Sequence, residues 1–104
     1  MKKHEREIIY KKLEEQNGRN NQIIKAIEEM SELIKELTKM LGKDTYTNNK
    51  NICEEIADAK ICIEQLERFV AHNNNIIDTI IDYKLKRLDM FYLNKENNNV
   101  SKNN

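Results

Sequence analysis

The chain has 104 residues, with 18 basic and 18 acidic side chains and a formal net charge of zero. This balance argues against a partner that is a nucleic-acid polymer, because general nucleic-acid binders usually carry a basic excess. Proline is absent and only two glycines occur, which disfavours turn-rich sandwiches and barrels and favours long helices. Apolar residues make up 38% of the sequence, which is little for a monomeric core. We therefore expect an all-α domain whose bundle is completed by oligomerisation.

The N-terminal sequence MKKHEREIIYKKLEE lacks the apolar region of a signal peptide, and no later stretch is long and apolar enough to span a membrane. We therefore expect a cytoplasmic protein with no membrane partner. Cys53 and Cys62 would lie about 13 Å apart on one helix, which is too far for a disulfide. Their spacing is not typical of a zinc site either. Both are interpreted as reduced thiols that favour the protein interior.

The first two predicted helices are separated by a tight turn. The first covers about residues 4–16 and ends at Asn17-Gly18, a strong turn signal. The second covers about residues 20–41. Gly42 follows it directly and suits the position just beyond a helix C-terminus, where glycine is favoured.

The third predicted helix follows a polar segment, residues 43–50, that is expected to form a loop. Asn51 is expected to cap this helix, and Glu54 stands three residues later as in a capping box. The helix is predicted to end near Val70, before the sequence AHNNN.

A fourth helix is predicted over about residues 75–92. The segment that follows, residues 93–104, is polar and is predicted to be a disordered tail, because it cannot bury enough apolar surface to order itself. The expected organisation is therefore one helical domain over residues 1–92.

The second predicted helix carries acidic residues along the edge of its apolar face. Its central apolar stripe comprises Ile23, Ile27, Met30, Ile34, Leu37 and Leu41, and its flank comprises Ala26, Leu33 and Met40. Glu29, Glu32 and Glu36 follow this flank. A solvated helix surface would by itself explain such a run of charge.

The third predicted helix brings an acid into its apolar face. Its apolar arc comprises Ile52, Ile56, Ala59, Ile63, Leu66 and Val70, extended on one side by Cys62 and Phe69. Glu55 falls inside this arc, and Asp58 lies at its border. A buried carboxylate must be protonated, paired with a cation or bound to a metal. The pattern therefore predicts a polar site on this face.

Two cations, Lys84 and Arg87, fall within the apolar arc of the fourth predicted helix. They could neutralise the acids through salt bridges, or they could bind the phosphates of a substrate, for which arginine and lysine are common donors. Both interpretations stay open, because a phosphate can replace a carboxylate as the partner of either cation.

The acids are arranged as Glu29-x-x-Glu32 and Glu55-x-x-Asp58. If the two helices are antiparallel neighbours, the four carboxylates converge, and an all-oxygen anionic cluster suits Mg²⁺ or Mn²⁺. No histidine follows any of these acids at the spacing used by di-iron bundle proteins. Sequence patterns for a phosphate-binding loop or a nucleophilic triad are also missing. The chemistry expected is a metal-assisted attack of water on a phosphoryl group.

Residues 27–33, IEEMSEL, contain the pattern E-E-x-x-E, and residues 55–58, EIAD, form E-x-x-D. Together these motifs resemble the signature of the MazG-like all-α nucleoside triphosphate pyrophosphohydrolases. Residues 83–88, YKLKRL, are similar to the Lys-x-x-Arg helix of small members of that family. The resemblance covers about residues 19–92.

The resemblance implies a four-helix protomer that forms a homodimer or homotetramer. It implies that Mg²⁺, or Mn²⁺ as a substitute, is held by four acids that are also the catalytic residues: Glu29, Glu32, Glu55 and Asp58. The implied reaction cleaves the α–β phosphate bond of a (deoxy)nucleoside triphosphate, giving a monophosphate and pyrophosphate, with Lys84 and Arg87 as phosphate ligands. Such a reaction serves nucleotide-pool house-cleaning. Two alternatives stay open, a phosphoribosyl-ATP pyrophosphohydrolase and a non-catalytic helical interaction module.

Overall fold

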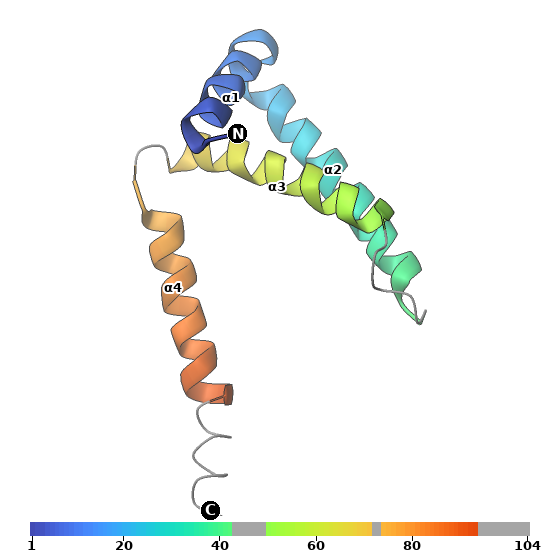
Figure 1. Ribbon diagram of the computed structural model, residues 1–104, viewed down its shortest axis with the longest axis vertical. Coiled ribbons are helices and arrows are strands. Elements are labelled where there is room, and N and C mark those ends of the chain that lie inside the picture. The colour runs from blue at the N-terminus through green and yellow to red at the C-terminus, as the bar shows by residue number, and fades with distance from the viewer. Residues whose placement is uncertain (43–49, 72–73, 94–104) are drawn as a thin grey trace, which may run out of the picture. The chain divides into compact units, whose positions relative to one another are not determined.

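The computed structural model describes residues 1–42, 50–71 and 74–93, and every regular element in these ranges is a helix (Figure 1). The elements are α1 (Lys3–Asn17), α2 (Arg19–Met40), α3 (Lys50–Val70) and α4 (Ile76–Leu88), followed by a π-helical turn (Asp89–Leu93). The predicted all-α class is thereby confirmed. The bounds of α1 and α2 lie within one residue of those predicted, and α3 ends at Val70 as predicted.

Both glycines lie at helix ends and have positive φ angles, which favour glycine over side chains with a Cβ. Gly18 (φ 82°) alone separates α1 from α2, and its N–H donates to the Glu14 carbonyl at 2.8 Å. Gly42 (φ 77°) follows Leu41, the C-cap of α2. The two predicted helix stops are therefore confirmed.

Two predicted boundaries need correction. Helix α3 begins at Lys50, so Asn51 is the second residue of the helix and not its N-cap. The regular α-helix of the fourth segment ends at Leu88, and the chain continues as a π-helical turn to Leu93, the first residue of the predicted tail. Lys50, the last residue of the predicted loop, is helical. The rest of that loop, residues 43–49, and the rest of the predicted tail, residues 94–104, lie outside the described residues.

The contacts divide the chain into two compact units, Met1–Val70 and Ala71–Asn104. In the first unit, α2 and α3 form the principal packed pair and run antiparallel to each other (Figure 1). The second unit contains α4 and the π-helical turn, in which no residue is buried. A single domain over residues 1–92 stays a prediction.

Polar contacts attach α1 to α3. The Tyr10 hydroxyl donates to the Glu64 carboxylate, which also accepts from the Arg6 guanidinium at 2.9 Å. Tyr10 is the only buried residue of α1. The burial of Tyr10 and, to a smaller extent, its hydrogen bond to the Glu64 side chain raise the pKa of Tyr10 to about 12. The phenol therefore stays protonated and keeps donating at neutral pH.

Glu14 links all three helices of the first unit. Its carboxylate pairs with Arg19 at the start of α2 and with Arg68 near the end of α3. The hydrogen bond from Arg19, together with that from Arg68, lowers the pKa of Glu14. The Arg19 guanidinium also lies 5.4 Å from the centroid of the Phe69 ring on α3, a cation–π distance. The end of α1 is thereby joined to both of its neighbours.

The helix α2 packs through the flank of its predicted apolar stripe. The helix α3 packs through part of its predicted arc, with Ile52 and Ala59 buried, together with the flanking Cys62. The contact side chains that are buried or half-buried include Gln22, Ala26, Glu29, Leu33 and Glu36 on α2 and Ile52, Glu55, Ala59, Cys62 and Leu66 on α3. Other residues of the stripes, such as Ile34 and Ile63, are exposed. Small residues at the contact, such as Ala26 and Ala59, allow the two helices a close approach.

The two cysteines differ in burial. Cys62 is buried in the contact between α2 and α3, as expected, whereas Cys53 is exposed on the first turns of α3. Both are free thiols. The expectation of an interior position is therefore confirmed for Cys62 and wrong for Cys53, which lies outside the packed arc of its helix.

Candidate metal centre

Three carboxylates converge where α2 and α3 pack together. Glu29 on α2 and the pair Glu55 and Asp58 on α3 each place one carboxylate oxygen within 4.8 Å of the other two. The two acids of α3 are three residues apart, so they lie on one side of the helix. Glu29 and Glu55 are half-buried and Asp58 is exposed. The cluster therefore lies at the border of the packed face, with one side towards solvent.

Glu32, the fourth predicted acid, lies one turn beyond Glu29 and is exposed. It is not one of the three converging carboxylates, although its charge contributes to the raised pKa of Glu55. Glu36 contributes in the same way and pairs with Lys39 at 3.4 Å. The sequence placed Glu36 on the acidic edge of the second predicted helix, but Glu36 was not included in the predicted site. Its spacing of seven residues from Glu29 is close to two helical turns, which would have placed both acids on one side of the helix.

Glu55 holds its negative charge in an unfavourable environment. Its Oε2 atom is shielded from solvent and has no hydrogen-bond partner. Removal from water raises the pKa of Glu55, and the negative charges of its neighbours, led by Asp58 and Glu29, raise it further. A carboxylate in this position is stabilised by a proton or a cation.

The residues fit a divalent cation with oxygen ligands. Such a cation takes carboxylate oxygens as its preferred ligands. It would provide the partner that the buried oxygen of Glu55 lacks and would cancel the repulsion among the three acids. The fit therefore rests on an orphaned buried oxygen as well as on the convergence of charge.

Lys25 is a cation at the edge of this cluster that sequence reasoning missed. Its Nζ atom lies 2.9 Å from Oε1 of Glu29, one helical turn away. The hydrogen bond to Glu29 raises the pKa of Lys25. The spacing of four residues between opposite charges was the signal that could have revealed it. The lysine is 61% exposed, and it neutralises Glu29 without satisfying Oε2 of Glu55.

The two predicted phosphate ligands lie on α4, in the second unit, and both are exposed. The Arg87 guanidinium lies 5.9 Å from the centroid of the Phe91 ring in the π-helical turn. The neighbouring Lys86, and not Lys84, pairs with Asp82 at 3.3 Å. The guanidinium of Arg87 and the ammonium of Lys84 are therefore accessible, and their phosphate-binding role stays a prediction.

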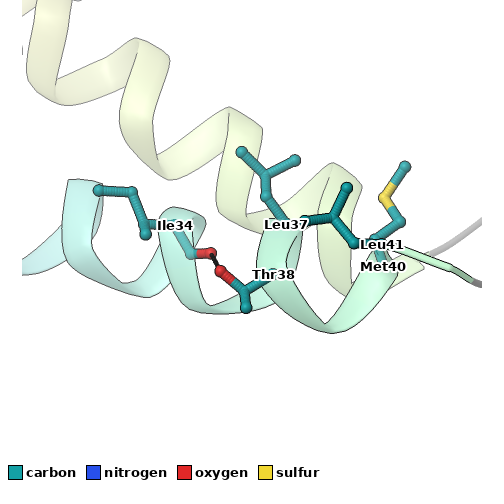
Figure 2. A pocket seen from close by; sticks show the side chains of 5 residues that line it. All are labelled: Ile34, Leu37, Thr38, Met40 and Leu41. Carbon is teal, nitrogen blue, oxygen red and sulfur yellow. Dashed lines mark hydrogen bonds between the residues drawn. The ribbon is translucent and has the colours of Figure 1, made fainter.

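An apolar depression of about 270 Å³ lies at the C-terminal end of α2 (Figure 2). It is lined by Ile34, Leu37, Thr38, Met40 and Leu41. The one hydroxyl among these residues, that of Thr38, donates to the Ile34 carbonyl at 2.8 Å. The depression therefore offers apolar surface, and its only side-chain hydroxyl is already bonded within the helix.

Comparisons with models of known protein families, with curated proteins and with solved structures found no match. Among the helices of the described ranges, none has the combined length and apolarity that crossing a membrane requires. Function must therefore be argued from the acidic cluster itself, because a helical fold is compatible with many activities.

Proposed function

We propose that this protein is a Mg²⁺-dependent nucleoside triphosphate pyrophosphohydrolase that acts in the cytoplasm. It would cleave the bond between the α and β phosphates, giving a nucleoside monophosphate and pyrophosphate. The observation that carries the proposal is the convergence of the Glu29, Glu55 and Asp58 carboxylates within 4.8 Å. The resemblance of the surrounding motifs to those of MazG-like enzymes supports the choice of a nucleotide substrate.

Glu29, Glu55 and Asp58 would hold the cation, Mg²⁺ or Mn²⁺ in its place. A bound divalent cation supplies positive charge that draws the substrate phosphates to the site and neutralises their oxygens. The negative charges of four neighbours raise the pKa of Glu55: Asp58, Glu29, Glu32 and Glu36. A cation at this site would therefore be attracted by acids beyond the three that would hold it. Glu36 takes part in this long-range attraction.

Glu32 is suited to handle the proton of the attacking water. It is exposed, it borders the cluster, and it is not one of the three converging carboxylates. Water would form the new bond to the α phosphorus while the bond to the bridging oxygen breaks. The electron pair then leaves with pyrophosphate, and the carboxylate of Glu32 accepts the water proton. Lys84 and Arg87 would bind the departing phosphates.

The test is the release of pyrophosphate from a panel of nucleoside triphosphates, with and without Mg²⁺. Glu55→Gln should lower kcat/KM by about a hundredfold or more, since it removes a metal ligand and its charge. The matched control is Glu54→Gln, which neutralises the exposed preceding residue on the same helix and should retain activity.

The panel also separates the alternatives. Hydrolysis of phosphoribosyl-ATP alone would assign the protein to that activity instead. Absence of pyrophosphate release from every nucleotide would contradict the enzymatic proposal and favour a helical interaction module. Equal activity of Glu54→Gln and Glu55→Gln would remove the acidic cluster from the mechanism.

A further inference from the structure

A single residue, Gly18, separates α1 from α2, and the chain bends sharply there (Figure 1). Gly18 has φ 82° and ψ 156°, whereas the residues on both sides of it, Asn17 and Arg19, are helical. A β carbon built on Gly18 would meet no atom within 4 Å. The bend therefore has room for a side chain, and only the backbone conformation disfavours one.

The helical hydrogen-bond pattern reaches Gly18 from both sides. The N–H of Gly18 donates to the carbonyl of Glu14 at 2.8 Å, and the carbonyl of Gly18 accepts from the N–H of Gln22 at 3.2 Å. Both bonds join residues that are four apart, as in an α-helix. A change of the two backbone dihedral angles of Gly18 to helical values would therefore align α1 and α2 as one continuous helix over residues 3–40.

Three further backbone bonds would complete this continuous helix. They would run from the N–H groups of residues 19–21 to the carbonyls of residues 15–17. In the bent form the carbonyl of Asn17 accepts instead from the side-chain amide of Asn21, at 2.7 Å. The side chain of Asn21 therefore takes the place of its own backbone N–H at the bend, and straightening would restore the backbone bond.

The contacts that hold α1 in the bent form are mainly polar. Tyr10 is the only buried residue of α1, and its hydroxyl shares the carboxylate of Glu64 with the guanidinium of Arg6. The second attachment to α3 is the ion pair between Glu14 and Arg68. Because dissolved salt screens such charges, the attachment of α1 should weaken as the ionic strength rises.

Arg19 has an acidic partner in either form. In the bent form its guanidinium pairs with the carboxylate of Glu14. In a continuous helix Glu15 would precede Arg19 by four residues, which is the spacing and the order at which an acid and a base stabilise a helix. Straightening would therefore exchange one ion pair of Arg19 for another, whereas the contacts of α1 with Glu64 and Arg68 would be lost.

We propose that residues 3–40 exchange between this bent form and a straight form in which α1 and α2 are one continuous helix. Gly18 is the hinge, and the carboxylates of Glu14 and Glu64 hold the bent form. Helices α2 and α3 stay packed in both forms, so the three acids of the candidate metal centre keep their positions. The proposal is therefore independent of the proposed activity. Salt shifts the equilibrium towards the straight form.

The distance between two spin labels, measured by double electron–electron resonance, distinguishes the two forms. The labels are attached to the full chain at Glu7→Cys and Lys39→Cys, both exposed positions. The background is Cys53→Ser, in which the remaining Cys62 is buried and stays unlabelled. Excess unlabelled protein ensures that only pairs within one chain are measured. At about 1.5 Å per residue, the two labelled positions lie about 48 Å apart in the straight form, and the bent form gives a shorter distance.

Gly18→Ala should raise the ratio of straight to bent form at least about tenfold, because alanine favours a helix and disfavours a positive φ. The matched control is Gly42→Ala, since Gly42 also has a positive φ (77°) and open space around a β carbon. This control should keep the distance distribution of the wild type. Circular dichroism reports whether the helices remain, and protection of Cys62 from thiol reagents reports whether α2 and α3 stay packed.

Glu64→Ala tests the contacts that hold the bent form. It removes the acceptor of both Arg6 and Tyr10 and should raise the ratio of straight to bent form about tenfold. Glu67→Ala is the control on the same helix, because Glu67 forms no ion pair within the described part of the chain. For the wild type, a change from about 0.1 to about 1 M salt, which shortens the Debye length from about 10 to about 3 Å, should act in the same direction.

The straight form should predominate when both changes are combined, in Gly18→Ala/Glu64→Ala at about 1 M salt. A double variant that gives only the short distance under these conditions would overturn the proposal. Equal distance distributions for Gly18→Ala and Gly42→Ala would also overturn it. So would a Cys62 thiol that becomes reactive whenever the long distance appears, because α2 and α3 would then be separating.

Discussion

Glu55 is half-buried, has a carboxylate oxygen without a hydrogen-bond partner, and has a raised pKa. Its position in the sequence predicted the first of these features. The helical wheel placed it between Ala59 and Cys62, both of which are buried in the structure. An acid at such a position must be paired, protonated or metal-bound, and this reasoning led to the candidate site. The wheel could not predict which oxygen would lack a partner, because that depends on the distance between the two helix axes. It also did not predict that Lys25 would neutralise Glu29.

The raised pKa of Glu55 predicts a distinctive pH dependence of stability in the absence of metal. The folded pKa lies above the ordinary value of 4.5, so the charged form destabilises the fold at neutral pH. This destabilisation is relieved as the pH falls through the folded pKa towards 4.5. Glu55→Gln should therefore melt at a higher temperature than the wild type at pH 7, and the difference should shrink on acidification.

Thermal melts followed by circular dichroism in a chelating buffer between pH 4.5 and 7.5 check this prediction. Glu54→Gln is the control and should follow the wild type, because its side chain is exposed. A Glu55→Gln protein that melts below the wild type at pH 7 would show that the carboxylate has a stabilising partner.

At the scale of the elements, the helices and most of their ends were predictable, and the packed faces were predictable only in part. Periodicity and the two glycines give the helices, since both signals are local. The choice of packed face depends on which side chains allow the closest approach of two helices. The sequence does not show that buried Ala26, Ala59 and Cys62 outweigh Ile34 and Ile63 in this choice, because both sets are apolar. For the same reason three of the four predicted acids converge, whereas Glu32 lies beside them.

The attachment of α1 to α3 predicts a measurable effect of one hydroxyl. Tyr10→Phe removes the donor to Glu64 and should lower the free energy of unfolding by about 1 kcal/mol at pH 7. The wild type should also lose stability between about pH 10 and 12, because the unfolded phenol releases its proton near 10.0 and the folded one only near 12. Tyr10→Phe should not show this loss of stability between pH 10 and 12.

Urea denaturation at pH 7 and pH 11 measures both effects. Tyr83→Phe is the matched control, since Tyr83 is 61% exposed on α4 and its hydroxyl should contribute nothing. Equal loss of stability at pH 11 in the wild type and in Tyr10→Phe would contradict the assigned hydrogen bond.

At the scale of the whole molecule, the proposed function gives Arg87 on α4 the role of a phosphate ligand. Arg87→Ala should lower kcat/KM for a nucleoside triphosphate about ten- to a hundredfold, which corresponds to one charge-assisted contact of about 1.5–3 kcal/mol. The melting temperature should change little, because Arg87 is exposed and contacts only the Phe91 ring among its described interactions. Lys86→Ala, which removes an exposed ion pair with Asp82, is the control for both readouts.

A strongly destabilised Arg87→Ala protein whose folded fraction keeps normal specific activity would contradict the phosphate role. That outcome would instead assign Arg87 a role in folding.

The central claim is that Glu29, Glu55 and Asp58 form a divalent metal site. Titration of the protein into Mn²⁺, with the free ion followed by electron paramagnetic resonance at pH 7, tests it most directly because no substrate is needed. The wild type and Glu54→Gln should both remove the free Mn²⁺ signal, and Glu55→Gln should bind at least about tenfold more weakly. A free Mn²⁺ signal that the wild type leaves unchanged, or identical binding by wild type and Glu55→Gln, would contradict the account.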